Sequence, residues 1–221
     1  MKYFVISDIH AHYDAMITAL HKSGYYQDND NHHLIILGDL FDRGMQTVQV
    51  LEYLYPLYLQ DKVTIILGNH DSFLLDFLDG NDTRSYFNVV RNGFGDTLYQ
   101  LSNIEPTLEN FPDIRNTIMD QYSFLKNLIS SFPYYLEIDK YVFVHGGIDG
   151  SKQDWKNTLT KDDYIWGREI QFSPIPGKIT VAGHHRVATI RKQTKDYKTL
   201  FKNSLYCKFN RMSMNSIEFA E

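Results

Sequence analysis

Short apolar stretches rich in branched side chains alternate along this chain with segments whose apolar residues recur every three or four positions. The stretches at residues 3–7, 34–37 and 63–67 predict strands buried on both faces, because such strands need apolar residues at successive positions. The segments at 14–22 and 45–58 predict amphipathic helices. Strands that alternate with helices predict βαβ units, and therefore an α/β fold.

The same reading extends to the rest of the chain. Residues 134–138 and 141–144, separated by two polar residues, predict a β-hairpin, and residues 179–182 predict another buried strand. The remaining predictions are helices at 71–78, 96–102 and 114–129 and closing strands at 187–191, 205–209 and 215–219. We therefore expect mixed β-sheets sandwiched between α-helices.

No Pro/Ser/Gly tract, repeat or low-complexity segment divides the 221 residues. We therefore expect one domain over residues 1–221. Within it, the polar, aromatic-dotted residues 80–135 are the least regular part and are expected to be an insertion that controls substrate access.

Charge and composition narrow the function classes. The net charge is −5, from 22 basic and 27 acidic residues, with no basic block, which argues against nucleic acid as a partner. No apolar run is long enough to cross a bilayer, and the N-terminus does not resemble a signal peptide. We therefore expect a cytoplasmic protein that does not bind membranes. We also expect a monomer. Cys207 is the only cysteine, so a metal site would use nitrogen and oxygen ligands.

Runs of potential metal ligands and phosphate-binding groups begin where predicted strands stop. They are Asp8-Ile9-His10, Gly38-Asp39-Leu40-Phe41-Asp42-Arg43-Gly44, Gly68-Asn69-His70-Asp71, His145-Gly146-Gly147 and Gly183-His184. Carboxylate oxygens and neutral imidazoles suit a hard divalent cation, and ligands in α/β sheets bind beyond the carboxyl ends of the strands. Together the runs predict a site for two metal ions at this edge.

Each run taken singly also suits an ordinary structural role. Asp42 could cap a helix and form a surface pair with Arg43, and Asn69 or Asp71 could cap the next helix beside a solvated His70. The order of all five runs is more specific than any one of them.

That order, over residues 3 to about 186, resembles the phosphoprotein phosphatase branch of the calcineurin-like metallophosphoesterases. The segments at 92–93, 141–149 and 166–169 are most similar to small bacterial and phage-type serine/threonine phosphatases. The resemblance implies the metallophosphoesterase fold, with a two-metal site at the carboxyl ends of the strands.

The resemblance also implies a ligand set. One metal would be held by Asp8, His10 and Asp39, and the other by Asp39, Asn69, His145 and His184. We expect two divalent ions, Mn²⁺ first and Fe or Zn as alternatives, about 4 Å apart. They would polarise the phosphoryl oxygens and deprotonate a shared water that attacks phosphorus in line.

Four further residues match catalytic positions of the family. Arg43 and Arg168 would clamp the phosphate oxygens, although a surface pair with Glu169 remains an alternative for Arg168. His70 would protonate the leaving group, and Asp42 would orient His70 and keep it cationic.

Some positions depart from the family pattern. Ser7 and Ala11 stand where glycines are usual, so we expect the first turn to adopt a conformation open to residues with a Cβ. Leu67 stands where well-known members carry an arginine before the Gly-Asn-His run, which removes one phosphate-side cation.

The resemblance predicts a metal-dependent phosphomonoester hydrolase, most simply a serine/threonine protein phosphatase whose partners are phosphoproteins or phosphopeptides. The alternative is a bis(5'-nucleosyl)-tetraphosphatase that hydrolyses a dinucleoside polyphosphate such as diadenosine tetraphosphate, which Leu67 favours because that branch also tolerates an apolar residue there. A catalytically silent metal-binding scaffold is the remaining possibility, which loss of a ligand or of the acid would favour.

Overall fold

The computed structural model describes residues 1–28, 32–168, 173–185 and 204–206. Its first sheet has the order β1 (Lys2–Ile6), β2 (His32–Ile36) and β3 (Val63–Ile65), with all strands parallel. The connections are α1 (Tyr13–Lys22) and α2 (Thr47–Leu59). The predicted βαβ units are therefore confirmed.

The second sheet is mixed. The predicted hairpin is present as β4 (Tyr135–Ile138) and β5 (Tyr141–Val144), which pair antiparallel. β6 (Ile179–Ala182) runs parallel to β5, and β7 (Ser204–Tyr206) runs parallel to β6. β7 overlaps the predicted strand 205–209, whose last residues lie outside the described part of the chain, as do the strands predicted at 187–191 and 215–219.

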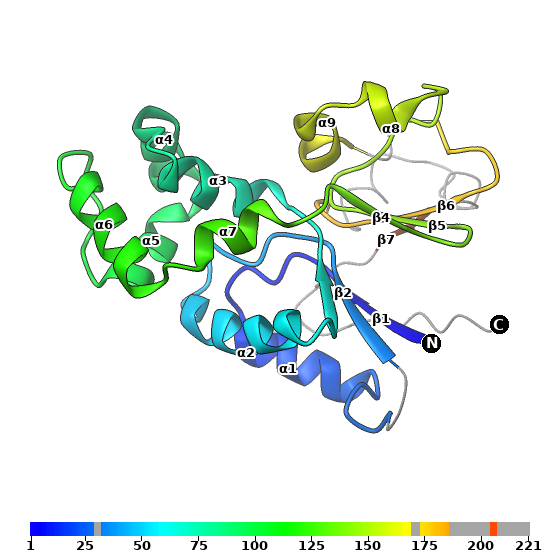
Figure 1. Ribbon diagram of the computed structural model, residues 1–221, viewed down its shortest axis with the longest axis horizontal. Helices are drawn as coiled ribbons and strands as arrows, with labels where there is room; N and C mark the ends of the chain where they lie inside the picture. The colour runs from blue at the N-terminus through cyan, green and yellow to red at the C-terminus, as the bar shows by residue number, and fades with distance from the viewer. Residues whose placement is uncertain (29–31, 169–172, 186–203, 207–221) are drawn as a thin grey trace.

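Alternate residues of β1, β5 and β6 enter different cores. Val5 of β1 packs in a small core with Phe143 of β5 and Val181 of β6, which lies between the two sheets. Phe4 and Ile6 belong instead to the large core shared with the helices. α1 and α2 lie along the first sheet, and α8 (Trp155–Thr158) and α9 (Lys161–Trp166) lie over the second (Figure 1). The sheets are thus sandwiched between helices, as the sequence predicts.

The middle of the chain forms a helical lobe beside the sheets (Figure 1). It contains α3 (Asn69–Leu78), α4 (Asp82–Asn92), α5 (Phe94–Ser102), α6 (Phe111–Gln121) and α7 (Leu125–Ser130). The helix predicted at 114–129 is therefore two helices, and α4, α8 and α9 were not predicted. Among the helices that the structure describes, none has the length and apolar character that a membrane span requires.

Candidate metal centre

The loops that leave β1 and β2 stay hydrogen-bonded to each other beyond the strands. The amides of Asp8, His10 and Ala11 donate to the carbonyls of Gly38, Asp39 and Leu40 over 3.2, 2.9 and 2.8 Å. The side chains of Asp8 and His10 therefore come from a loop that lies directly against the loop of Asp39.

Left-handed backbone is concentrated in these loops. Of the ten non-glycine residues with positive φ in the described ranges, six are in the strand-end runs and a seventh, Ala11, directly follows the first run; the six are Asp8, His10, Asp39, Asp42, Arg43 and His184. Such conformations cost free energy and persist where the surrounding structure enforces them, often at functional sites. The expectation that the first turn is open to residues with a Cβ holds at Ser7, which is not among the residues with positive φ, and is wrong at Ala11, which has a φ of +51°.

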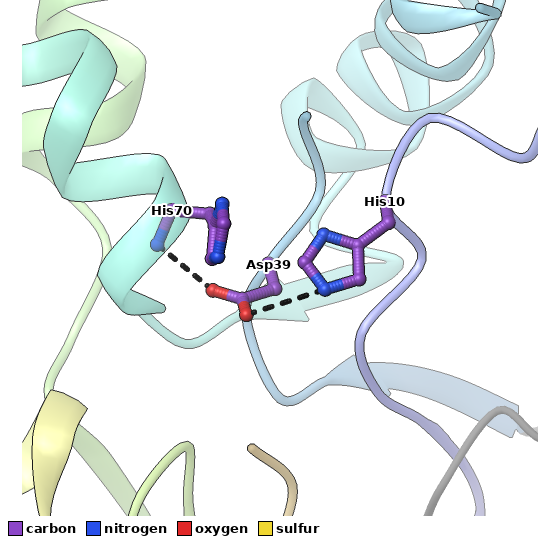
Figure 2. A group of neighbouring side chains, drawn as sticks. All are labelled: His10, Asp39 and His70. Carbon is purple, nitrogen blue, oxygen red and sulfur yellow. Dashed lines mark hydrogen bonds and ion pairs between the residues drawn. The ribbon is translucent and has the colours of Figure 1, made fainter. Parts of the chain in front are cut away.

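Asp39 is buried, at 2% exposure, between two histidines. One carboxylate oxygen lies 3.6 Å from Nε2 of His10, and the other lies 3.4 Å from Nε2 of His145. The backbone N–H of His70 donates to the second oxygen over 2.9 Å. Figure 2 shows the carboxylate between His10 and the start of α3, where His70 lies.

His145 brings the second sheet to the centre. Its Nδ1 lies 2.6 Å from the carbonyl oxygen of Leu37, which can only accept, so Nδ1 carries the proton. In the neutral ring Nε2 then has no proton, yet it faces Oδ1 of Asn69 at 2.9 Å and the Asp39 carboxylate at 3.4 Å. Acceptor atoms that converge in a buried site fit a bound cation, so these residues suit the metal that the sequence predicts.

Two sets of side chains place ligand atoms within 4.8 Å of one another. One set is His10, Asp39 and His70, and the other is Asp39, His145 and His184. Asp39 belongs to both sets, as a carboxylate shared by two metal ions would.

Asp8 belongs to neither of these sets. Its Oδ2 accepts from the hydroxyl of Ser7 at 2.5 Å and from the amide of His184 at 3.1 Å. The structure therefore brings five of the six predicted metal ligands into one cluster and places Asp8 at its edge, where it supports the backbone of His184.

Three of the predicted catalytic residues, Arg43, His70 and Asp42, are joined by hydrogen bonds beside His10. Two nitrogens of the Arg43 guanidinium donate to Nε2 of His10 and Nε2 of His70, each over 2.7 Å. Nδ1 of His70 pairs with Oδ2 of Asp42 at 2.6 Å. Arg168 is exposed, and its charge is among the causes that lower the pKa of His184. Glu169 lies outside the described residues, so the surface pair with Arg168 stays untested.

Burial dominates the protonation of the centre. It lowers the pKa of His10 to about 3, of His70 to about 4 and of His184 to about 3. It raises the pKa of Asp39 to about 7 and of Asp42 to about 8. The lowered pKa of His70 is opposite to the expected cationic state, because burial and the Arg43 charge lower this pKa more than the nearby carboxylates raise it.

Asp71 is a member of the centre that sequence reasoning missed. Its buried carboxylate accepts the backbone N–H groups of Gly68, Asp39 and Leu40 over 2.9, 2.8 and 2.8 Å. Burial and the Asp39 charge raise the pKa of Asp71 to about 7, against the opposing effect of these hydrogen bonds. The last position of the Gly68-Asn69-His70-Asp71 run was the available signal. We propose that Asp71 positions the loop that carries Asp39.

Gly68 is required where these loops meet. A Cβ at this position would lie 2.3 Å from both the amide nitrogen and Oδ1 of Asp39. A side chain here would therefore displace the shared carboxylate or the start of α3.

The sequence model of the calcineurin-like phosphoesterase family matches residues 1–211. The chain therefore belongs to the calcineurin-like phosphoesterase family. The family assignment agrees with the fold and with the two sets of His and Asp ligands.

Similar proteins differ in the activity that they are named for. The chain is 29% identical over 175 residues to bis(5'-nucleosyl)-tetraphosphatase PrpE [asymmetrical] of Bacillus subtilis, covering 76% of this chain and 66% of that protein. It is 23% identical over 208 residues to serine/threonine-protein phosphatase 2 of Salmonella typhimurium, covering 92% of this chain and 84% of that protein. The first tetraphosphatases that it resembles are matched over 31% to 66% of their own length.

The fold is also similar to a solved structure. The crystal structure of a putative diadenosine tetraphosphatase superposes with a TM-score of 0.52 at 16% identity, covering 94% of this chain and 82% of the other. This similarity concerns the fold.

Proposed function

We propose that this chain hydrolyses dinucleoside tetraphosphates with two divalent metal ions, Mn²⁺ being the first ion to test. The observation that carries the two-metal chemistry is the Asp39 carboxylate, whose oxygens face His10 on one side and His145 on the other. A shared carboxylate between two imidazole-containing groups is suited to two ions that act on one phosphoryl group.

The ligands of the first ion would be Asp8, His10 and Asp39, of which His10 and Asp39 already place their ligand atoms together. The ligands of the second would be Asp39, Asn69, His145 and His184. When bound, the ions would polarise the phosphoryl oxygens and activate the attacking water.

The chain's own residues would supply orientation and a proton. The guanidinium of Arg43, and that of Arg168, would bind phosphate oxygens through planar N–H pairs. With substrate bound, Arg43 would turn from Nε2 of His70 to the phosphate, and Nε2 would take up a proton. As the new P–O bond forms and the bond to the leaving oxygen breaks, His70 would transfer that proton from Nε2 to the leaving oxygen. Asp42 would hold Nδ1 of the same ring, as it does in this structure. The charge of the bound phosphate would raise the pKa of His70 from its lowered value.

Leu67 favours a dinucleoside polyphosphate over a phosphoprotein as the substrate. It is buried, and its amide donates to the carbonyl of Pro133 over 2.9 Å, so this position offers no cation to a phosphate. A terminal phosphomonoester is a dianion near neutral pH, whereas each internal phosphate of a dinucleoside tetraphosphate carries one negative charge. The missing cation is therefore less costly for the second substrate.

Trp166 supports a substrate with a nucleobase. Its indole is 40% exposed and lies 5.9 Å from the imidazole of His184, nearly perpendicular to it. An exposed aromatic face beside the candidate centre can stack on a base, which commonly contributes about 1–3 kcal/mol.

The deciding experiment compares diadenosine tetraphosphate with a phosphothreonine peptide under the same Mn²⁺ concentration. We expect kcat/KM to be higher for diadenosine tetraphosphate, and Trp166→Ala to raise KM for it while leaving KM for 4-nitrophenyl phosphate nearly unchanged. Tyr86→Ala is the matched control, because Tyr86 is 43% exposed on α4 and makes no predicted contact with substrate. Preference for the peptide would contradict the proposal.

A serine/threonine protein phosphatase is the second candidate. The relative from Salmonella typhimurium, which covers 92% of this chain, supports it. A high rate on phosphopeptides, with no effect of Trp166→Ala on diadenosine tetraphosphate hydrolysis, would favour this candidate.

A further inference from the structure

Thr97 of α5 forms two hydrogen bonds with one distant residue of the centre. Its hydroxyl donates to Oδ1 of Asp42 over 2.6 Å and accepts the backbone N–H of Asp42 over 2.9 Å. Thr97 and Asp42 are both fully buried, at 0% exposure. The contact joins the helical lobe to the loop after β2.

These bonds fix the direction of the Asp42 carboxylate. The only hydroxyl proton of Thr97 is directed to Oδ1, so Oδ2 is the oxygen left for Nδ1 of His70, 2.6 Å away. The Asp42 backbone is left-handed, with a φ of +73°, and its amide is held by the same hydroxyl. Side chain and backbone of Asp42 are therefore fixed from one point.

A second contact of the lobe lies beside the first. The amide of Arg43 approaches the carbonyl oxygen of Gly93, between α4 and α5, at 3.4 Å. A Cβ on Gly93 would lie 3.1 Å from the amide nitrogen and Cγ of Arg43. The turn that carries Asp42 and Arg43 thus packs against the lobe as well as against the sheet.

We propose that Thr97 is a positioning residue for proton transfer to the leaving group, acting through Asp42 on His70. This inference rests on the proton-donor role proposed above for His70, and it applies to any phosphate ester whose leaving oxygen needs a proton. It gives residues 80–135 a part in the chemistry that is separate from substrate access.

The test is the dependence of kcat on the leaving group. Phenyl phosphate has a poor leaving group that needs a proton, whereas 4-nitrophenyl phosphate has a good one. In Thr97→Val, which keeps the shape of the side chain without the hydroxyl, we expect kcat for phenyl phosphate to fall about tenfold more than kcat for 4-nitrophenyl phosphate, since general-acid catalysis contributes about 10²- to 10⁴-fold in full. Thr97→Ser should restore most of the lost rate.

Thr47 offers a matched control. It is also 0% exposed, but its hydroxyl makes no hydrogen bond within the described ranges. Thr47→Val should therefore leave the ratio of the two rates unchanged. Melting temperatures of all three variants would show whether Thr97→Val is folded, and Thr97→Ser keeps the test usable if it is not.

A readout independent of turnover is the NMR signal of the His70 Nδ1 proton. The short bond to Asp42 should give a low-field signal in the parent protein, and Thr97→Val should move it upfield or broaden it by exchange. An unchanged ratio of rates and an unchanged signal in folded Thr97→Val would overturn the inference. If His70→Asn also leaves the ratio unchanged, the proton-donor role of His70 fails, which is a different result from failure at Thr97 alone.

Discussion

Replacing Asp71 with asparagine would remove one of the two oxygens that hold the loops of the centre together. In the parent protein, Oδ2 accepts from the amides of Gly68 and Asp39, and Oδ1 accepts from the amide of Leu40. An asparagine that keeps its oxygen at the first position must turn its NH₂ group toward the N–H of Leu40. Two donors would then face each other inside the protein.

The magnitude follows from these contacts. A hydrogen bond to a charged group contributes about 1.5–3 kcal/mol, and a buried unsatisfied donor costs about 1–3 kcal/mol. Part of this loss is offset because the amide brings no charge into a fully buried position, where burial raises the pKa of Asp71 to about 7. We therefore expect Asp71→Asn to lower the free energy of unfolding by about 3 kcal/mol.

The assay combines urea unfolding with calorimetric titration of Mn²⁺. Because the Asp71 bonds hold the left-handed Asp39 in place, Asp71→Asn should weaken metal binding at least tenfold. The control is Ile118→Ala, which truncates a fully buried side chain on α6, away from the loops of the centre. It should lower the free energy of unfolding by a similar amount, about 2–5 kcal/mol. Equal metal affinity in the two variants would refute a positioning role for Asp71.

Three further predictions concern the same centre. The metal-free protein should lose stability as pH rises from about 6.5 to 8. In this range the folded state retains protons on Asp39, Asp71 and Asp42, whose pKa values burial raises to about 7, 7 and 8, while the unfolded chain has already released them. Chemical unfolding at each pH would measure the loss, and added Mn²⁺ should abolish it. Arg43→Lys should reduce kcat/KM at least tenfold, because one ammonium cannot present two phosphate oxygens with the planar pair of nitrogens that reach His10 and His70 in this structure; activity close to that of the parent would show that the fork is unnecessary. Gly68→Ala should abolish tight metal binding in calorimetry, because its Cβ would collide with Asp39, whereas Gly80→Ala, where the Cβ meets open space and the cost is backbone strain at a φ of +87°, should retain it.

The strands and most helices could be predicted because their apolar residues face a core at regular intervals. α4 could not, because its pattern is inverted: Ser85 and Asn88 are buried, while Tyr86, Phe87 and Val90 are exposed. A helix whose polar side chains face inward gives no usable periodicity. α9 had a signal that was not used, since Thr160 and Asp163 form a capping box at its start.

The residues of the candidate site also fall into those that the sequence could predict and those that it could not. Residues in the strand-end runs could be predicted because the carboxyl ends of parallel strands meet at one edge. Thr97 could not, since it contacts Asp42 across 55 positions of sequence and no local pattern marks it. The left-handed φ of Ala11 had a signal, because glycine is usual at this position in the family and glycine is favoured where φ is positive.

The hydrogen bond from His145 to Leu37 ties the end of β5 to the end of β2, so the candidate ligands of one ion come from two separate sheets. An ion bound there would link the first sheet to the second and would oppose movement of one sheet relative to the other. Loading with metal should therefore slow amide hydrogen exchange in Val5, Ile35 and Phe143, which fill the space between the layers, far more than in the outlying helix α6.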